Sequence, residues 1–87
     1  MSETVKPETR LAVVAIVVEE PESVSELNGL LHQFSGHIIG RMGIPCPHRG
    51  VSLISVAVDA SSDVISALTG KLGRLKGVSV KTAYSRS

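Results

Sequence analysis

Sulfur and imidazole side chains gather in one short stretch of the sequence, where they could hold a metal ion. Cys46 and His48 are separated by a single residue, and His37 lies shortly before them. Thiolate and imidazole are suitable ligands for zinc, nickel and copper. A structural zinc site normally has two such pairs of ligands, however, and this chain contains a single Cys-x-His pair. A metal sensor using Cys46 and His48, with His37 as an optional third ligand, is therefore an alternative hypothesis, and a turn with a surface thiol is the preferred interpretation.

No other residues have the spacing of a catalytic site or a cofactor motif. The acidic residues between positions 19 and 26 surround the expected start of a helix, where negative charge suits the helix dipole. Gly70 and Gly73 lack the preceding strand that a dinucleotide-binding fingerprint requires. We therefore predict that the chain is not an enzyme and needs no cofactor.

Length and charge narrow the class of protein further. The 87 residues are the size of one small domain, which we expect over residues 10–87 after a flexible tail over residues 1–9. A net charge of +1 gives no electrostatic reason to bind nucleic acid or an anionic membrane. The longest apolar run, Leu11 to Val18, is too short to span a membrane. Because the single cysteine suits a reducing compartment, we expect a soluble cytoplasmic protein.

Hydrophobic patterns predict four strands and two helices. Runs rich in β-branched residues, and an alternating pattern near the C-terminus, indicate strands over 10–18, 37–44, 51–58 and 78–84. Spaced leucines indicate one helix from about Pro21 to Ser35 and another that starts at residues 61–63 and stops at Gly77.

The segment between the second and third strands holds two prolines. We predict a turn over residues 45–50, because proline cannot continue a sheet ladder. Gly40 and Gly43 in the second strand indicate an edge strand or a bulge.

The order strand, helix, strand, strand, helix, strand predicts a ferredoxin-like sandwich of the α+β class. This fold is a four-stranded antiparallel sheet with two helices on one face. We expect the first and third strands, the most apolar, to lie at the centre of the sheet and to run parallel to each other.

Two helices leave the other face of such a sheet uncovered. The first strand is apolar on both of its sides, and a bare face of that kind is uncommon on a soluble monomer. We therefore expect a closed homodimer or a tetramer, although a tolerated bare face is the alternative. The residues expected at this interface are Val14, Ile16, Val51, Leu53, Ile54 and Val56.

Small residues form a strip on the second helix, opposite its leucines. At about 100° per residue, Ser66, Gly70 and Gly73 fall on one side. A helical glycine is roughly 0.5–1 kcal/mol less favourable than alanine. The strip therefore suggests close approach by another backbone or by a ligand, and simple exposure to water is the other interpretation.

Two stretches of the sequence are similar to a known family. They are VSELNGLLHQFS, running on to RMGIP, and ALTGKLGRLKGVSVKT. Together they resemble the regulator family of the iron-only hydrogenase system, whose members have a small ACT-like, ferredoxin-like fold. The resemblance covers residues 10–83, and the segment GKLGRLKGV carries most of it.

The resemblance implies a stand-alone ACT-like regulatory module with no established ligand or target and no catalytic residues. ACT-like domains commonly associate through their sheets and bind small effectors at subunit interfaces, often near the first strand–helix turn. The metal-responsive domain of nickel regulators shares the fold and forms tetramers, but the histidine-rich strand of that domain is missing here.

Fold analogy and glycine placement together suggest where an effector would bind. The candidate regions are the turn at residues 18–23, the predicted hairpin at residues 41–50 and the side of the second helix that carries Gly70 and Gly73. The candidate ligand-binding residues are Glu20, Ser23, Arg41, Gly43, Arg49, Gly70 and Gly73. A purely structural assembly module without a ligand remains a further alternative.

Overall fold

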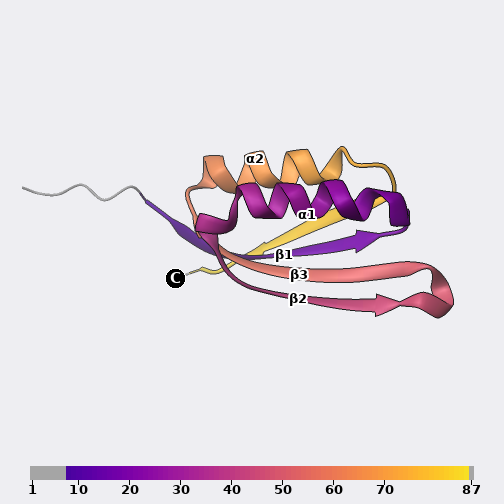
Figure 1. Ribbon diagram of the computed structural model, residues 1–87. Helices are drawn as coiled ribbons and strands as arrows, with labels where there is room; N and C mark the ends of the chain where they lie inside the picture. The colour runs from indigo at the N-terminus through magenta and orange to yellow at the C-terminus, as the bar shows by residue number, and fades with distance from the viewer. Residues whose placement is uncertain (1–7, 87) are drawn as a thin grey trace, which may run out of the picture.

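Four strands and two helices follow one another in the order expected from the sequence (Figure 1). The computed structural model describes residues 8–86. The elements are β1 (Arg10–Val18), α1 (Val24–Gln33), β2 (Ile38–Cys46), β3 (Val51–Ala60), α2 (Ser62–Gly73) and β4 (Val78–Tyr84). Three short 3₁₀ turns, η1 (Pro21–Ser23), η2 (Ser35–His37) and η3 (Pro47–Arg49), join them. The tail expected over residues 1–9 lies, for residues 1–7, outside the described residues.

The sheet has the strand order β2-β3-β1-β4, and every neighbouring pair is antiparallel. This confirms the predicted α+β class and ferredoxin-like arrangement, with the first and third strands at the centre. The prediction that these two strands run parallel was wrong. The α1 crossover makes β1 and β2 parallel, and β3 returns between them through a hairpin, so that β3 opposes both.

The edge strand β2 is longer than the sequence suggested. A bulge interrupts its pairing with β3 between Ile38 and Gly40, as the glycines indicated. The strand continues through Pro45, opposite Ser52, to Cys46. Proline is tolerated here because an edge strand has one side on which a missing N–H breaks no ladder bond. The turn is correspondingly short and consists of η3 and Gly50, which has φ 66°.

The second helix starts as predicted and ends early. Ser61 caps it, since the Val64 N–H donates a hydrogen bond of 3.2 Å to the Ser61 hydroxyl oxygen. The helix ends at Gly73, before the predicted stop at Gly77. Gly77 instead lies in the loop before β4 with φ 70°, where an added Cβ would be 3.0 Å from the Glu20 backbone nitrogen. The close approach of two chain segments therefore requires glycine at this position.

Both helices pack on the same face of the sheet (Figure 1). The core between them comprises Ala12, Val14, Ile16, Val18, Leu27, Leu31, Val56, Val58, Ala60, Ile65, Leu68 and Leu72. The even-numbered residues of β1 and β3 thus point toward the helices, because side chains alternate along a strand.

This burial corrects the interface predicted from the sequence. Val14, Ile16 and Val56 are at most 1% exposed beneath the helices. Ile54 is partly buried against the same core. These four side chains are unavailable on the uncovered face, and the expected set retains only Val51 and Leu53 there. The error arose because both sides of β1 are apolar, so the pattern did not distinguish the covered side from the uncovered one.

Candidate functional site

The uncovered face of the sheet, which we call the open face, carries several large apolar side chains. In β1 and β3, Leu11, Val13 and Leu53 occupy the odd positions that point away from the core. In β2, Met42 and Ile44 lie opposite Ser55 and Leu53 and therefore share their side of the sheet. Together with Ile39 at the bulge, these side chains are between 41% and 63% exposed. The open face therefore presents apolar surface to its surroundings.

Two hollows make the open face uneven. A hollow of about 420 Å³ lies by Leu11, Val13 and Ile39 at one end. A second hollow, of about 250 Å³, lies by Met42 and Leu53 at the other. Its charged residues, Asp59 and Lys81, are opposite Leu11 and Ala15 in the register and lie beside the apolar area. Such relief allows another apolar surface to interlock with it.

The turn after β1 and the β2–β3 turn come together at one end of the sheet. They enclose a cavity of about 230 Å³ that contains Cys46. Its other lining residues are Val18, Pro21, Val24, Pro45, Pro47, Gly50, Val51 and Ser52. Two of the regions proposed from the sequence for effector binding are thus neighbours, although the lining is almost wholly apolar.

The seven residues proposed for ligand binding are spread over several parts of the molecule. Arg41 and Gly43 lie on β2, and Arg49 lies in η3. Gly70 and Gly73 are exposed on the outer side of α2, with no atom within 4 Å of an added Cβ. The structure therefore does not bring these residues together into one site.

Glu20 and Ser23, the remaining two, join the turn after β1 to the loop before β4. Ser23 is 4% exposed, and its hydroxyl donates a hydrogen bond of 2.6 Å to the Lys76 carbonyl oxygen. The Glu19 N–H donates to the Gly77 carbonyl oxygen at 2.7 Å, and the Glu20 side chain lies against Gly77. These contacts give Ser23 and Glu20 a structural role within the chain.

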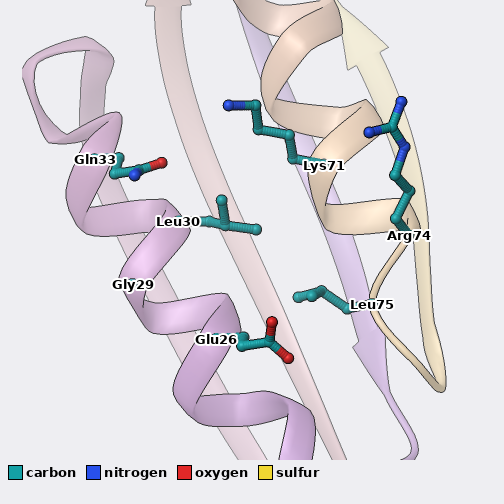
Figure 2. A pocket seen from close by; sticks show the side chains of 7 residues that line it. All are labelled: Glu26, Gly29, Leu30, Gln33, Lys71, Arg74 and Leu75. Carbon is teal, nitrogen blue, oxygen red and sulfur yellow. The ribbon is translucent and has the colours of Figure 1, made fainter.

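A groove of about 440 Å³ runs between the two helices (Figure 2). Leu30 of α1 and Leu75, just after α2, point toward each other across it. Lys71 comes from α2, with its ammonium nitrogen 5.8 Å from the centre of the Phe34 ring. The groove is also lined by Glu26, Gly29, Gln33 and Arg74. Its charges have both signs, because the acidic Glu26 lies in the same groove as the basic Lys71 and Arg74.

The structure separates His37 from Cys46 and His48, the other two residues of the metal-sensor alternative. His37 ends η2 just before β2, whereas Cys46 is the last residue of the same strand. Nine extended residues separate two points by roughly 30 Å. Within residues 8–86, no group of three or more His, Cys, Asp and Glu side chains is placed to hold a metal ion. The three residues therefore cannot bind one ion in this fold.

A polar cleft between α1 and β2 brings Arg41, one of the residues proposed from the sequence for ligand binding, together with polar residues that sequence reasoning did not assign to a site. Asn28, His32, Ser35 and Arg41 line it, with Leu31 and Ile38. A helical spacing of four between Asn28 and His32 was a usable signal. Arg41 comes from a different element, and its position in the cleft could not be predicted before the strand register was known.

The helix and strand arrangement defines a small α+β domain of the ferredoxin-like class with one uncovered sheet face. The TM1266-like family, described as "Iron-only hydrogenase system regulator, putative", matches residues 10–82. The chain belongs to this family, as its resemblance indicated.

A solved structure supports this assignment. It is described as the structure of uncharacterized protein TM1266 from Thermotoga maritima, and it has a TM-score of 0.87 to this chain. The two sequences are 36% identical over 91% of this chain and 100% of that one. Among curated proteins, none matches the chain. Within the described residues, neither helix has the length and apolar character that crossing a membrane would require.

Proposed function

We propose that the chain is a stand-alone, non-enzymatic ACT-like module that regulates the iron-only hydrogenase system in the cytoplasm. It self-associates through its open face as a dimer or tetramer and binds a small effector. The observation that carries this proposal is the cluster of exposed apolar side chains on one face of the sheet. Single exposed apolar residues are normal on a protein surface, whereas a contiguous cluster marks an interaction surface.

A second copy is the occupant best suited to the open face. Two such sheets can stack at about 10 Å, with the side chains of the facing surfaces interdigitating. In a two-fold arrangement, the Leu53 end of one copy meets a hollow of the other, and both copies bury the same surface. Burial of apolar surface contributes about 25 cal/mol per Å², and this contribution favours the closed assembly.

Assembly also provides a way to regulate. An effector shifts an equilibrium only by its difference in affinity for the two states. An effector that binds the assembled form more tightly than the single chain therefore changes the amount of assembly. A hydrogenase-system partner that contacts only one of these forms would then respond to the effector concentration.

A pair of matched variants tests the role of the open face. Leu53→Asp places a carboxylate within the proposed interface, where burying an unpaired charge is expected to weaken assembly strongly. Ala67→Asp introduces the same charge at an exposed position of α2, on the other side of the molecule. We expect light scattering to give an oligomer for the parent chain and for Ala67→Asp, and a monomer for Leu53→Asp. An unchanged mass for Leu53→Asp contradicts the proposal.

The effector is tested separately by a thermal-shift screen. Any compound that binds only the folded chain stabilises it by mass action, by about 2.7 kcal/mol at one hundred times its Kd. We expect a hit from a panel of amino acids, nucleotides and small organic acids. A panel without any stabilising compound contradicts the effector part of the proposal and leaves assembly to be judged by the variants.

A further inference from the structure

A cleft between α1 and β2, on the other side of α1 from the interhelical groove, is lined by several polar side chains. Its volume is about 310 Å³, at the lower end of the range for small-molecule sites. Asn28 and His32 come from consecutive turns of α1, Ser35 comes from η2, and Arg41 comes from β2. Residues that are far apart in the chain thus converge on one place, with Leu31 and Ile38 as an apolar floor.

The fold fixes the position of Arg41. It lies opposite Val56 in the register and so shares the helix-facing side of the sheet with this fully buried residue. A terminal guanidinium nitrogen of Arg41 donates a hydrogen bond of 3.0 Å to the Asn28 side-chain oxygen. This bond orients the guanidinium beside α1 and leaves its other N–H groups as donors.

The charge of the cleft is one-sided. Arg41 is a permanent cation, His32 and Ser35 can donate hydrogen bonds, and none of the lining residues is acidic. Glu26, the acidic residue of α1, lines the interhelical groove on the other side of the helix. Nothing that lines the cleft therefore neutralises the guanidinium.

We propose that this cleft is the effector site, and that the effector is a small molecule bearing a carboxylate or a phosphate. The guanidinium fork matches the paired oxygens of these groups and can donate two parallel hydrogen bonds to them. His32 and Ser35 supply further donors, and the floor of Leu31 and Ile38 fits a short hydrocarbon portion. The inference rests on the effector part of the proposed function and does not depend on assembly.

The test uses two simple probes, inorganic phosphate and butyrate, titrated into the isotopically labelled full chain. We expect saturable changes in the backbone amide NMR signals of residues 28–41 with at least one probe. A response to phosphate alone identifies a phosphate-bearing effector, and a response to butyrate alone identifies a carboxylate-bearing one. The absence of saturable changes with either probe overturns the proposal.

Variants separate a specific site from general charge attraction. Arg41→Gln should weaken binding of the responding probe at least about tenfold, because a charge-assisted hydrogen bond is lost. Arg86→Gln removes the same charge from an exposed residue that follows β4, outside the cleft, and should change affinity less than about twofold. Equal weakening by both variants overturns the proposal.

A second substitution of Arg41 tests whether weaker binding could come from a change in folding. Arg41→Lys keeps the positive charge and loses the fork, so we expect it to unfold like the parent chain and to bind more weakly. Parent-like affinity in Arg41→Lys contradicts recognition by the fork.

Failure of this site can be distinguished from failure of the proposed function. Light scattering on the same samples reports assembly independently of the titrations. If a compound from the thermal-shift panel binds but moves only signals outside residues 28–41, the effector stands and this cleft is excluded.

Discussion

Replacing Ser23 with alanine tests whether this residue serves the fold or a ligand. The residue is 4% exposed, and its hydroxyl donates a hydrogen bond of 2.6 Å to the Lys76 carbonyl oxygen. The bond joins segments that are 53 residues apart in the chain. The substitution removes the donor and leaves the carbonyl without this partner in a partly buried place.

The expected loss of stability follows from that geometry. Leaving one partner of a buried hydrogen bond unsatisfied costs about 1–3 kcal/mol. For a domain of this size, each kcal/mol lowers Tm by roughly 4–8 °C. We therefore expect Ser23→Ala to lower the free energy of unfolding by about 1–3 kcal/mol and Tm by roughly 5–20 °C, without any ligand present.

The assay is urea unfolding followed by circular dichroism, at one fixed protein concentration because assembly also affects apparent stability. Ser25→Ala is the matched control, since Ser25 is exposed on α1 and alanine is a favourable helix residue. We expect this control to unfold like the parent chain. If Ser23→Ala stays within about 0.5 kcal/mol of the parent, the structural role assigned to Ser23 is wrong.

Three further predictions concern the glycines and the thiol. Gly77→Ala should destabilise the chain by at least about 1–2 kcal/mol in thermal unfolding, because alanine at positive φ is strained and its Cβ would meet Glu20. Stability equal to that of the parent chain would contradict the loop geometry. Gly70→Ala should stabilise the chain by about 0.5–1 kcal/mol, because its surroundings are open; a loss of stability or of assembly would instead indicate a close contact with a partner. Zinc and nickel should give the same calorimetric titrations with the parent chain and with Cys46→Ser, and a metal signal that disappears in this variant would restore the metal-sensor hypothesis.

The order and type of the elements could be predicted from the sequence because local patterns determine them. β-Branched runs marked the strands, and the N-cap position of Ser61 marked the start of α2. The end of α2 was missed because its leucine pattern continues through Leu75, where the chain has already begun to turn back toward β4.

The position of a site depended on information that the sequence does not contain. Leu53 and Ile54 are similar apolar neighbours in β3, and only the packing of the helices decides which of them faces outward. Likewise, Arg41 could be assigned to the cleft beside Asn28 only once the register of β2 with β3 was known. Tertiary packing, rather than periodicity, thus determines both surfaces.

Sedimentation equilibrium of the unmodified chain, over a range of micromolar concentrations, tests most directly whether the open face is covered by a second copy. The mass of one chain is 9.1 kDa. We predict a mass two or four times that value, stable across the concentrations used. A mass of 9.1 kDa throughout would show that the open face stays uncovered and would contradict self-association.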